Sequence, residues 1–157
     1  MELTFTVYGK PEPQGSIRAF VPKGWTRPVL TSTNKKLKGW RNAVAMTARE
    51  QIYEGAVMNG ARWVIADAGV PVGVEFTFFL LKPRSAKKNR SCPAVKPDLD
   101  KLMRAACDAM TGIVYLDDAQ VCEATVRKCY GTPERTEIRV WLLAAGSQFV
   151  TPLQKVA

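Results

Sequence analysis

The feature that most constrains the fold is an apolar run near the middle of the chain, at residues 74–81. It reads Val-Glu-Phe-Thr-Phe-Phe-Leu-Leu, so six of its eight side chains are apolar. A half-exposed edge strand would alternate apolar and polar side chains more strictly than this run does. We therefore predict a strand over residues 72–81 that occupies a central position in a sheet.

Other segments have the two-residue period of half-buried strands. Residues 3–9 alternate apolar with polar side chains, and residues 121–130 and 136–143 do so as well. Gly-Thr-Pro at residues 131–133 separates the last two, which predicts that they form a hairpin. The apolar residues 63–65 predict one more short strand.

Two segments have the period of amphipathic helices. The first is expected to begin at a cap within residues 32–34 and to run to about residue 54. The second is expected over residues 98–111, with Gly112 as its stop. The Pro/Gly-rich segment from Gly9 to Arg27 predicts an ordered loop, and residues 82–91 predict a mobile basic loop.

These elements predict one α+β domain with a mixed sheet and two main helices. At 157 residues the chain can bury one core but is short for two ordinary domains. We expect the domain to span residues 1–145 and residues 146–157 to form a flexible tail. No apolar run is long enough to span a membrane, and the N-terminus lacks the pattern of a signal peptide. The expected location is therefore the cytoplasm, without membrane partners.

Charge favours a polyanionic partner such as nucleic acid. The chain has 23 Lys and Arg against 14 Asp and Glu, a net charge of +9, and a pI of about 9.6. A generic basic surface is the alternative. If the partner is DNA, the expected contacts are the basic residues of the first loop, the first helix and the second loop: Arg18, Lys35, Lys36, Lys38, Arg41, Arg84, Lys87, Lys88 and Arg90.

The absence of histidine excludes several chemistries. Catalysis by Ser-His-Asp or Cys-His groups is impossible, and so is a histidine general base. The four cysteines form no CxxC pair, so we expect reduced thiols rather than a zinc site. Any hydrolysis must therefore use carboxylates, lysine or a metal ion.

Two groups of aspartates are candidates for that chemistry. Asp98 and Asp100 stand where the second helix begins, and Asp117 and Asp118 follow an apolar stretch before the next strand. Helix capping and an acidic turn are the structural alternatives. Hard oxygen ligands at two places would also suit Mg²⁺, which binds through one or two carboxylates, waters and substrate phosphate oxygens.

The order of these residues resembles that of the RusA-type Holliday junction resolvases. The resemblance lies in Lys-Pro-Asp-Leu-Asp-Lys-Leu at residues 96–102, Asp-Ala-Met at 108–110 and Leu-Asp-Asp-Ala-Gln-Val at 116–121, ending near Lys128. It implies a small homodimeric endonuclease of DNA recombination and repair. Such an enzyme binds four-way DNA junctions and cuts two opposing strands symmetrically with Mg²⁺, Mn²⁺ being a possible substitute and no small-molecule cofactor being needed. An enzyme of this kind would suit a phage or prophage.

The resemblance also assigns roles to residues. It makes Asp98, Asp100 and Asp118 the catalytic metal ligands, with Asp117 as a neighbour that either helps to bind the metal or forms a hydrogen bond. The family pattern often has Asn and Lys where this chain has Lys101 and Arg104.

Both departures from the family pattern leave questions open. Arg104 can bind a phosphate in place of the usual lysine, or form an i,i+4 ion pair with Asp100. Whether Lys101 perturbs the metal site is open. Lys128 is either a group that reaches the scissile phosphate or an exposed strand lysine. Asp108 lies ten residues after Asp98 on the expected helix, so we expect it to form structural hydrogen bonds instead of sharing the metal ion.

Two alternative functions remain compatible with the sequence. In one, the chain binds branched or duplex DNA without cutting it, and the aspartates are caps and turns. In the other, it is a nuclease of broader structure preference that cuts flaps or replication forks.

Overall fold

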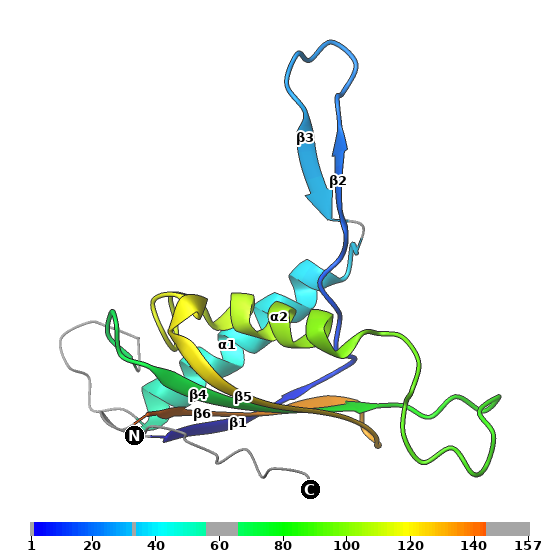
Figure 1. The fold of residues 1–157 in the computed structure, drawn as a ribbon, viewed down its shortest axis with the longest axis vertical. Coiled ribbons are helices and arrows are strands. Elements are labelled where there is room, and N and C mark those ends of the chain that lie inside the picture. Colours follow the sequence, from blue (N-terminus) through cyan, green and yellow to red (C-terminus); the bar gives the residue numbers. More distant parts are fainter. Residues whose placement is uncertain (1, 33, 56–65, 144–157) are drawn as a thin grey trace, which may run out of the picture.

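The computed structural model describes residues 2–32, 34–55 and 66–143. It contains a four-stranded sheet with two helices on one of its faces, and a separate two-stranded hairpin (Figure 1). The sheet has the order β1-β6-β4-β5, in which only β4 and β5 are parallel. The predicted α+β domain with a mixed sheet and two main helices is confirmed. The sheet strands are β1 Glu2–Tyr8, β4 Val72–Leu80, β5 Val121–Tyr130 and β6 Arg135–Leu142.

Strand β4 is central, as its apolar sequence predicted. It pairs with β5 along one side and with β6 along the other. Phe76 and Phe78 on its helix-covered face are fully buried, and their ring centroids lie 5.9 Å apart. Burial of such side chains contributes about 1.5–3 kcal/mol each, so this strand anchors the core.

The two helices pack across that face. Helix α1 spans Leu37–Gly55 and presents Trp40, Val44 and Ala48 to the core. Helix α2 spans Leu99–Met110 and connects β4 to the parallel β5, which makes a β-α-β crossover. Both helices agree with the predictions, except that α1 begins three residues after Asn34, so Lys35 and Lys36 precede it.

The predicted hairpin of the last two strands is wrong, because β4 lies between β5 and β6. Residues 131–134 cross the end of β4: the Gly131 N–H donates to the Leu80 carbonyl at 3.0 Å, and the Leu81 N–H donates to Glu134 Oε1 at 3.3 Å. A Cβ on Gly131 would lie 2.6 Å from Phe79 Cδ1, so a larger residue would force Phe79 to move, whereas glycine permits this close crossing without a shift. The alternation of apolar and polar residues shows which face of a strand is buried, but it does not show which strands lie beside it. The pairing of the two strands could therefore not be read from their sequences.

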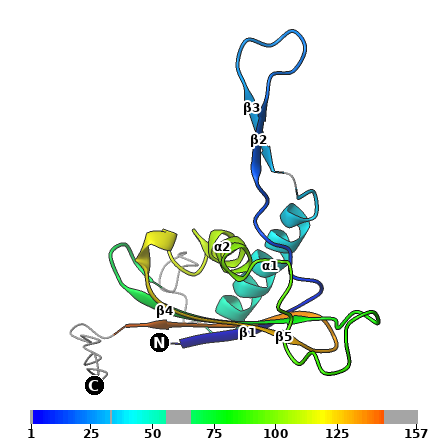
Figure 2. The ribbon, with the colours of Figure 1, turned by 45° about the vertical axis from the view of Figure 1, so that its right-hand side comes forward.

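The loop predicted from Gly9 to Arg27 is also partly wrong. Strands β2 Ile17–Phe20 and β3 Val29–Ser32 pair with each other and with no other strand that the structure describes. Figure 2 shows this hairpin standing away from the rest of the molecule. Arg18 therefore lies in a strand rather than in a loop.

Two further predictions fall on other parts of the chain, and a third concerns membrane-spanning helices. The short strand at 63–65 and the tail from residue 146 lie outside the described residues. Among the described helices, none is long and apolar enough to cross a membrane.

Candidate active site

The first acid group lies beside a cleft at the start of α2. Asp98 is the N-cap residue in an extended conformation, yet its side chain makes no capping hydrogen bond. It lines a cleft of about 410 Å³ between residues 10–16 and the start of α2. The cleft is also lined by Lys10, Lys96 and Lys101. Glu12 is the other acid of the lining. The carboxylate of Asp98 thus lies at a hollow in which lysines outnumber acids, instead of capping the helix end.

Lys101 is the immediate partner of Asp98. Its Nζ lies 2.9 Å from Asp98 Oδ2, and both side chains are nearly half exposed. The hydrogen bond and the charge of Lys101, followed by the charges of Lys96 and Lys128, hold the pKa of Asp98 below its ordinary value. An exposed pair of this kind contributes little to stability. The main consequence of the pair is that Asp98 stays ionised and is already paired with the ammonium group of Lys101.

Lys128 supports the same segment from strand β5. Its Nζ donates hydrogen bonds to the carbonyl oxygens of Val95, at 2.7 Å, and Pro97, at 2.8 Å. The two carbonyls belong to the three residues that precede Asp98. Lys128 is thus not a free strand lysine, because it binds the backbone of the segment that leads into α2.

The second acid group lies at the other end of α2, in the short 3-10 helix η1 Asp118–Gln120. Asp117 is its N-cap, and Asp117 Oδ1 accepts a hydrogen bond from the Ala119 N–H at 2.8 Å. Asp117 therefore has a structural hydrogen-bonding role, one of the two that the sequence left open. Asp118 is exposed.

Gln120 is the residue of this turn that the sequence analysis missed. It is only 8% exposed, and its Oε1 accepts hydrogen bonds from the N–H groups of Leu116 and Asp117. Its Nε2 donates to the carbonyls of Asp67, at 2.6 Å, and Val70, at 2.9 Å. The signal was present, since Asp-x-x-Gln at residues 117–120 has the pattern of a capping box.

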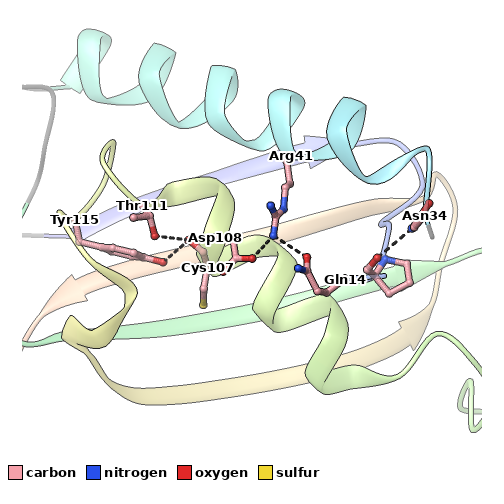
Figure 3. A network of polar contacts seen from close by, with 8 residues as sticks. Gln14, Asn34, Arg41, Cys107, Asp108, Thr111 and Tyr115 are labelled. Carbon is pink, nitrogen blue, oxygen red and sulfur yellow. Dashed lines mark hydrogen bonds and ion pairs between the residues drawn. The ribbon is translucent and has the colours of Figure 1, made fainter. Parts of the chain in front are cut away.

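A polar network joins the two helices and the N-terminal loop (Figure 3). Arg41 of α1 forms an ion pair with Asp108 of α2 and donates a hydrogen bond to Gln14 Oε1 at 2.7 Å. The structural role predicted for Asp108 is confirmed. Arg41 is half-buried and already paired, so it is less available to DNA than an exposed cation.

The other predicted site residues whose side chains the structure describes lie at or near the surface. Arg104 is exposed, and no ion pair joins it to Asp100 in the described structure. The side chain of Arg18 is outside the described part of the structure. The other predicted DNA contacts are exposed or half-exposed: Lys35, Lys36, Lys38, Arg84, Lys87, Lys88 and Arg90.

The two acid groups lie near opposite ends of α2. From Asp100 to Asp108 the helix rises about 12 Å at about 1.5 Å per residue. Burial raises the pKa of Cys107 to about 11, and the charges of Asp118 and Asp108 act in the same direction. The turn η1, which contains Asp118, packs against α2 and leads into the start of β5, whereas Lys128, which binds the residues before Asp98, lies near the end of that strand. By contrast, the charges that shift the pKa of Asp98 are those of Lys101, Lys96 and Lys128.

The aspartate side chains of the two acid groups have the right chemistry to bind a hard cation, but their arrangement in the structure is less suitable. Carboxylate oxygens are the ligands that Mg²⁺ prefers. Within residues 2–32, 34–55 and 66–143, however, no group of three or more His, Cys, Asp or Glu side chains is arranged to hold a metal ion. Asp98 and Asp100 alone can supply the one or two carboxylates that Mg²⁺ commonly takes from a protein.

Ionised carboxylates beside a lysine-lined cleft, in a strongly basic chain, are typical of proteins that act on phosphodiesters. Comparison with known proteins agrees: a family model for the endodeoxyribonuclease RusA matches residues 10–141. The chain belongs to the RusA endodeoxyribonuclease family, which implies endodeoxyribonuclease activity. It is also similar to the uncharacterized protein YqaN of Bacillus subtilis (strain 168), with 28% identity over 138 residues, 88% of this chain and 94% of the relative.

Proposed function

We propose that this chain is a Mg²⁺-dependent endonuclease that cuts four-way DNA junctions symmetrically as a homodimer during recombination or repair. The observation that carries the proposal is the match of the RusA family model to residues 10–141. The acids at the start of α2 support it, because Asp98 lines a cleft of about 410 Å³ that Lys10, Lys96 and Lys101 also line.

Each side chain of the site has a proposed task. Asp98 and Asp100 are the proposed metal ligands. Asp118, which lies at the other end of α2 in the same chain, is the proposed third carboxylate, and the Asp118→Asn variant tests whether it serves the same site. When bound, Mg²⁺ (or Mn²⁺) supplies Lewis acidity and a water of lowered pKa. Arg104 is exposed on α2, where it can pair with a phosphate oxygen in bidentate fashion. Lys128 acts by fixing the segment that carries Asp98.

The substrate preference is tested on four DNA forms side by side. The purified chain is incubated with a four-way junction of fixed crossover, a flap, a fork and a linear duplex, each with Mg²⁺ and with a chelator. We expect paired nicks at symmetric positions of the junction, and no product with the chelator. Faster cutting of the flap or fork would instead establish a broader structure-selective nuclease. Binding to the junction without any product, with Mg²⁺ or Mn²⁺, would establish a non-catalytic protein.

Lys101 is expected to weaken metal binding, because its ammonium group occupies the position beside Asp98 that a cation would take. Lys101→Asn should lower the Mg²⁺ concentration for half-maximal cleavage by about threefold to tenfold, since two unit charges this close still interact in water. The measurement is a Mg²⁺ titration of initial cleavage rates. Lys87→Asn makes the same change of charge in the exposed loop, and equal shifts in both variants would attribute the effect to net charge alone.

Lys128 is expected to position Asp98. Lys128→Met removes both hydrogen bonds to the carbonyls of residues 95 and 97, so cleavage should fall by about 10-fold to 100-fold, as for other groups that orient a ligand. Hydrogen exchange should become faster at residues 95–98, a readout independent of activity. Arg127→Met is the matched control, because Arg127 pairs with Glu75 instead. Unchanged exchange at residues 95–98 would contradict the positioning role.

A further inference from the structure

The β2–β3 hairpin has little support from the core. Its two strands pair only with each other among the described strands, and it stands away from the sheet and the helices (Figures 1 and 2). An isolated two-stranded hairpin is marginally stable at best in water. It therefore contributes little to folding, and its sequence is free to serve contact with a partner.

The base of the hairpin is nevertheless fixed, and it is fixed beside the candidate active site. The side chain of Asn34, just after β3, donates hydrogen bonds to Glu12 Oε2 and to the Pro13 carbonyl, both at 3.0 Å. The Gln14 N–H, before β2, donates to the Lys101 carbonyl in the first turns of α2 at 2.9 Å. These contacts close the hairpin at its base and tie it to the helix that carries Asp98 and Asp100.

The tip exposes apolar side chains that a monomer would normally bury. Phe20 is 50% exposed, Val21 56% and Trp25 63%. The Trp25 N–H donates to the Pro22 carbonyl at 3.0 Å, and Gly24 at the third position of this turn has a φ of +87°. A positive φ there is the requirement of a type II turn, which glycine meets without strain. The turn holds the backbone of Trp25 at the far end of the hairpin.

The charge around the tip identifies the class of partner. No acidic residue occurs between Pro13 and Arg49, and the tip itself carries Lys23 and Arg27. Gly24, Trp25, Thr26 and Arg27 also line a shallow hollow. Exposed aromatic rings beside cations are how proteins bind unpaired or unstacked nucleotides: the ring stacks on a base and the cations neutralise phosphates. A continuous duplex hides its base faces, whereas a branch point exposes them.

We propose that the β2–β3 hairpin recognises the branch point of DNA by stacking Trp25 on a base face exposed there, with Lys23 and Arg27 on the adjoining phosphates. This inference rests on the proposed function, since it requires that the substrate be branched. The inference goes beyond that function because it names the part of the protein that distinguishes a branch point from a duplex. That part is the hairpin, which is separate from the aspartates proposed to perform the cleavage.

The test compares the binding of Trp25→Ala to a four-way junction and to a linear duplex of the same sequence, with Asp100→Asn in every protein to keep the DNA intact. The Kd for the junction should rise by about 5-fold to 150-fold, the range for loss of one stacked base, while the Kd for the duplex changes by less than about twofold. Trp25→Phe should restore most of the affinity. Met46→Ala, which removes a 59% exposed apolar side chain from α1, is the control and should change neither Kd.

A second measurement reports stacking directly. A 2-aminopurine base at the crossover should change its fluorescence when the Trp25 protein binds, and should not do so with Trp25→Ala at saturating protein. Equal losses of affinity on junction and duplex, or an unchanged preference for the junction, would overturn the hairpin inference alone. The hairpin inference would also be overturned if Trp25→Ala changed the protein from a dimer to a monomer in the absence of DNA. That result would assign the hairpin tip to the contact between subunits. No preference for the junction in the protein with Trp25 would instead overturn the proposed function.

Discussion

Asp100→Asn should reduce junction cleavage by about 100-fold to 1000-fold while the Kd for the junction stays within about threefold. The physical reason is that a neutral amide is a poor ligand for a hard divalent cation, and a bound metal is worth several kcal/mol of transition-state stabilisation. Asp100 is exposed in the first turn of α2, so its replacement should leave the fold intact. The measurement is a single-turnover cleavage assay at saturating enzyme, together with a binding titration.

The position of Asp117 and Asp118 at the other end of α2 calls for a second set of variants in the same assay. Asp118→Asn should cause a loss as large as that of Asp100→Asn if both acid groups serve one site. Asp117→Asn is the matched control, because asparagine caps helices as well as aspartate does, and it should retain near-normal cleavage. Full activity of Asp118→Asn would restrict the site to the start of α2. Full activity of Asp100→Asn would remove the catalytic assignment altogether.

Gln120→Leu should have the largest effect on stability among the polar substitutions near the site. It removes four hydrogen bonds, so the N–H groups of Leu116 and Asp117 and the Val70 carbonyl lose Gln120 as their partner. The Asp67 carbonyl keeps the hydrogen bond that it accepts from the Val70 N–H. Buried polar groups left unpaired cost about 1–3 kcal/mol each, and partial access to water in this turn reduces the sum, so we expect a loss of about 2–4 kcal/mol in the free energy of unfolding. Urea denaturation at equilibrium measures that loss.

The control for Gln120 is Gln14, whose side chain makes one hydrogen bond within the described part of the chain. Among the described residues, Gln14→Leu removes the bond to Arg41 alone, and Arg41 keeps its ion pair with Asp108, so the cost should stay below about 1.5 kcal/mol. Equal costs for the two variants would show that Gln120 does not organise the turn. Gln120→Leu should also slow cleavage in the folded protein, because Asp118 belongs to the turn that Gln120 holds.

The sequence by itself determined the local elements and the order of the acids. The apolar run at 74–81 required a buried central strand, and the spacing of Leu102, Ala106 and Met110 required an amphipathic α2. These features depend on backbone hydrogen bonding and side-chain periodicity within a few residues, so they can be read from one segment at a time. The same is true of the Asp98 and Asp117 groups, whose order around α2 carried the family resemblance.

Only the tertiary structure decided which residues meet. The crossing at Gly131 places β4 between β5 and β6. The contacts of Asn34 close the base of the β2–β3 hairpin, which the Pro/Gly-rich sequence of that segment did not predict. Lys128 reaches carbonyls more than thirty positions away only because the β4-α2-β5 crossover brings the end of β5 to the start of α2. The same crossover places the two acid groups at opposite ends of one helix, a separation set by helix length and not by the chemistry of the residues.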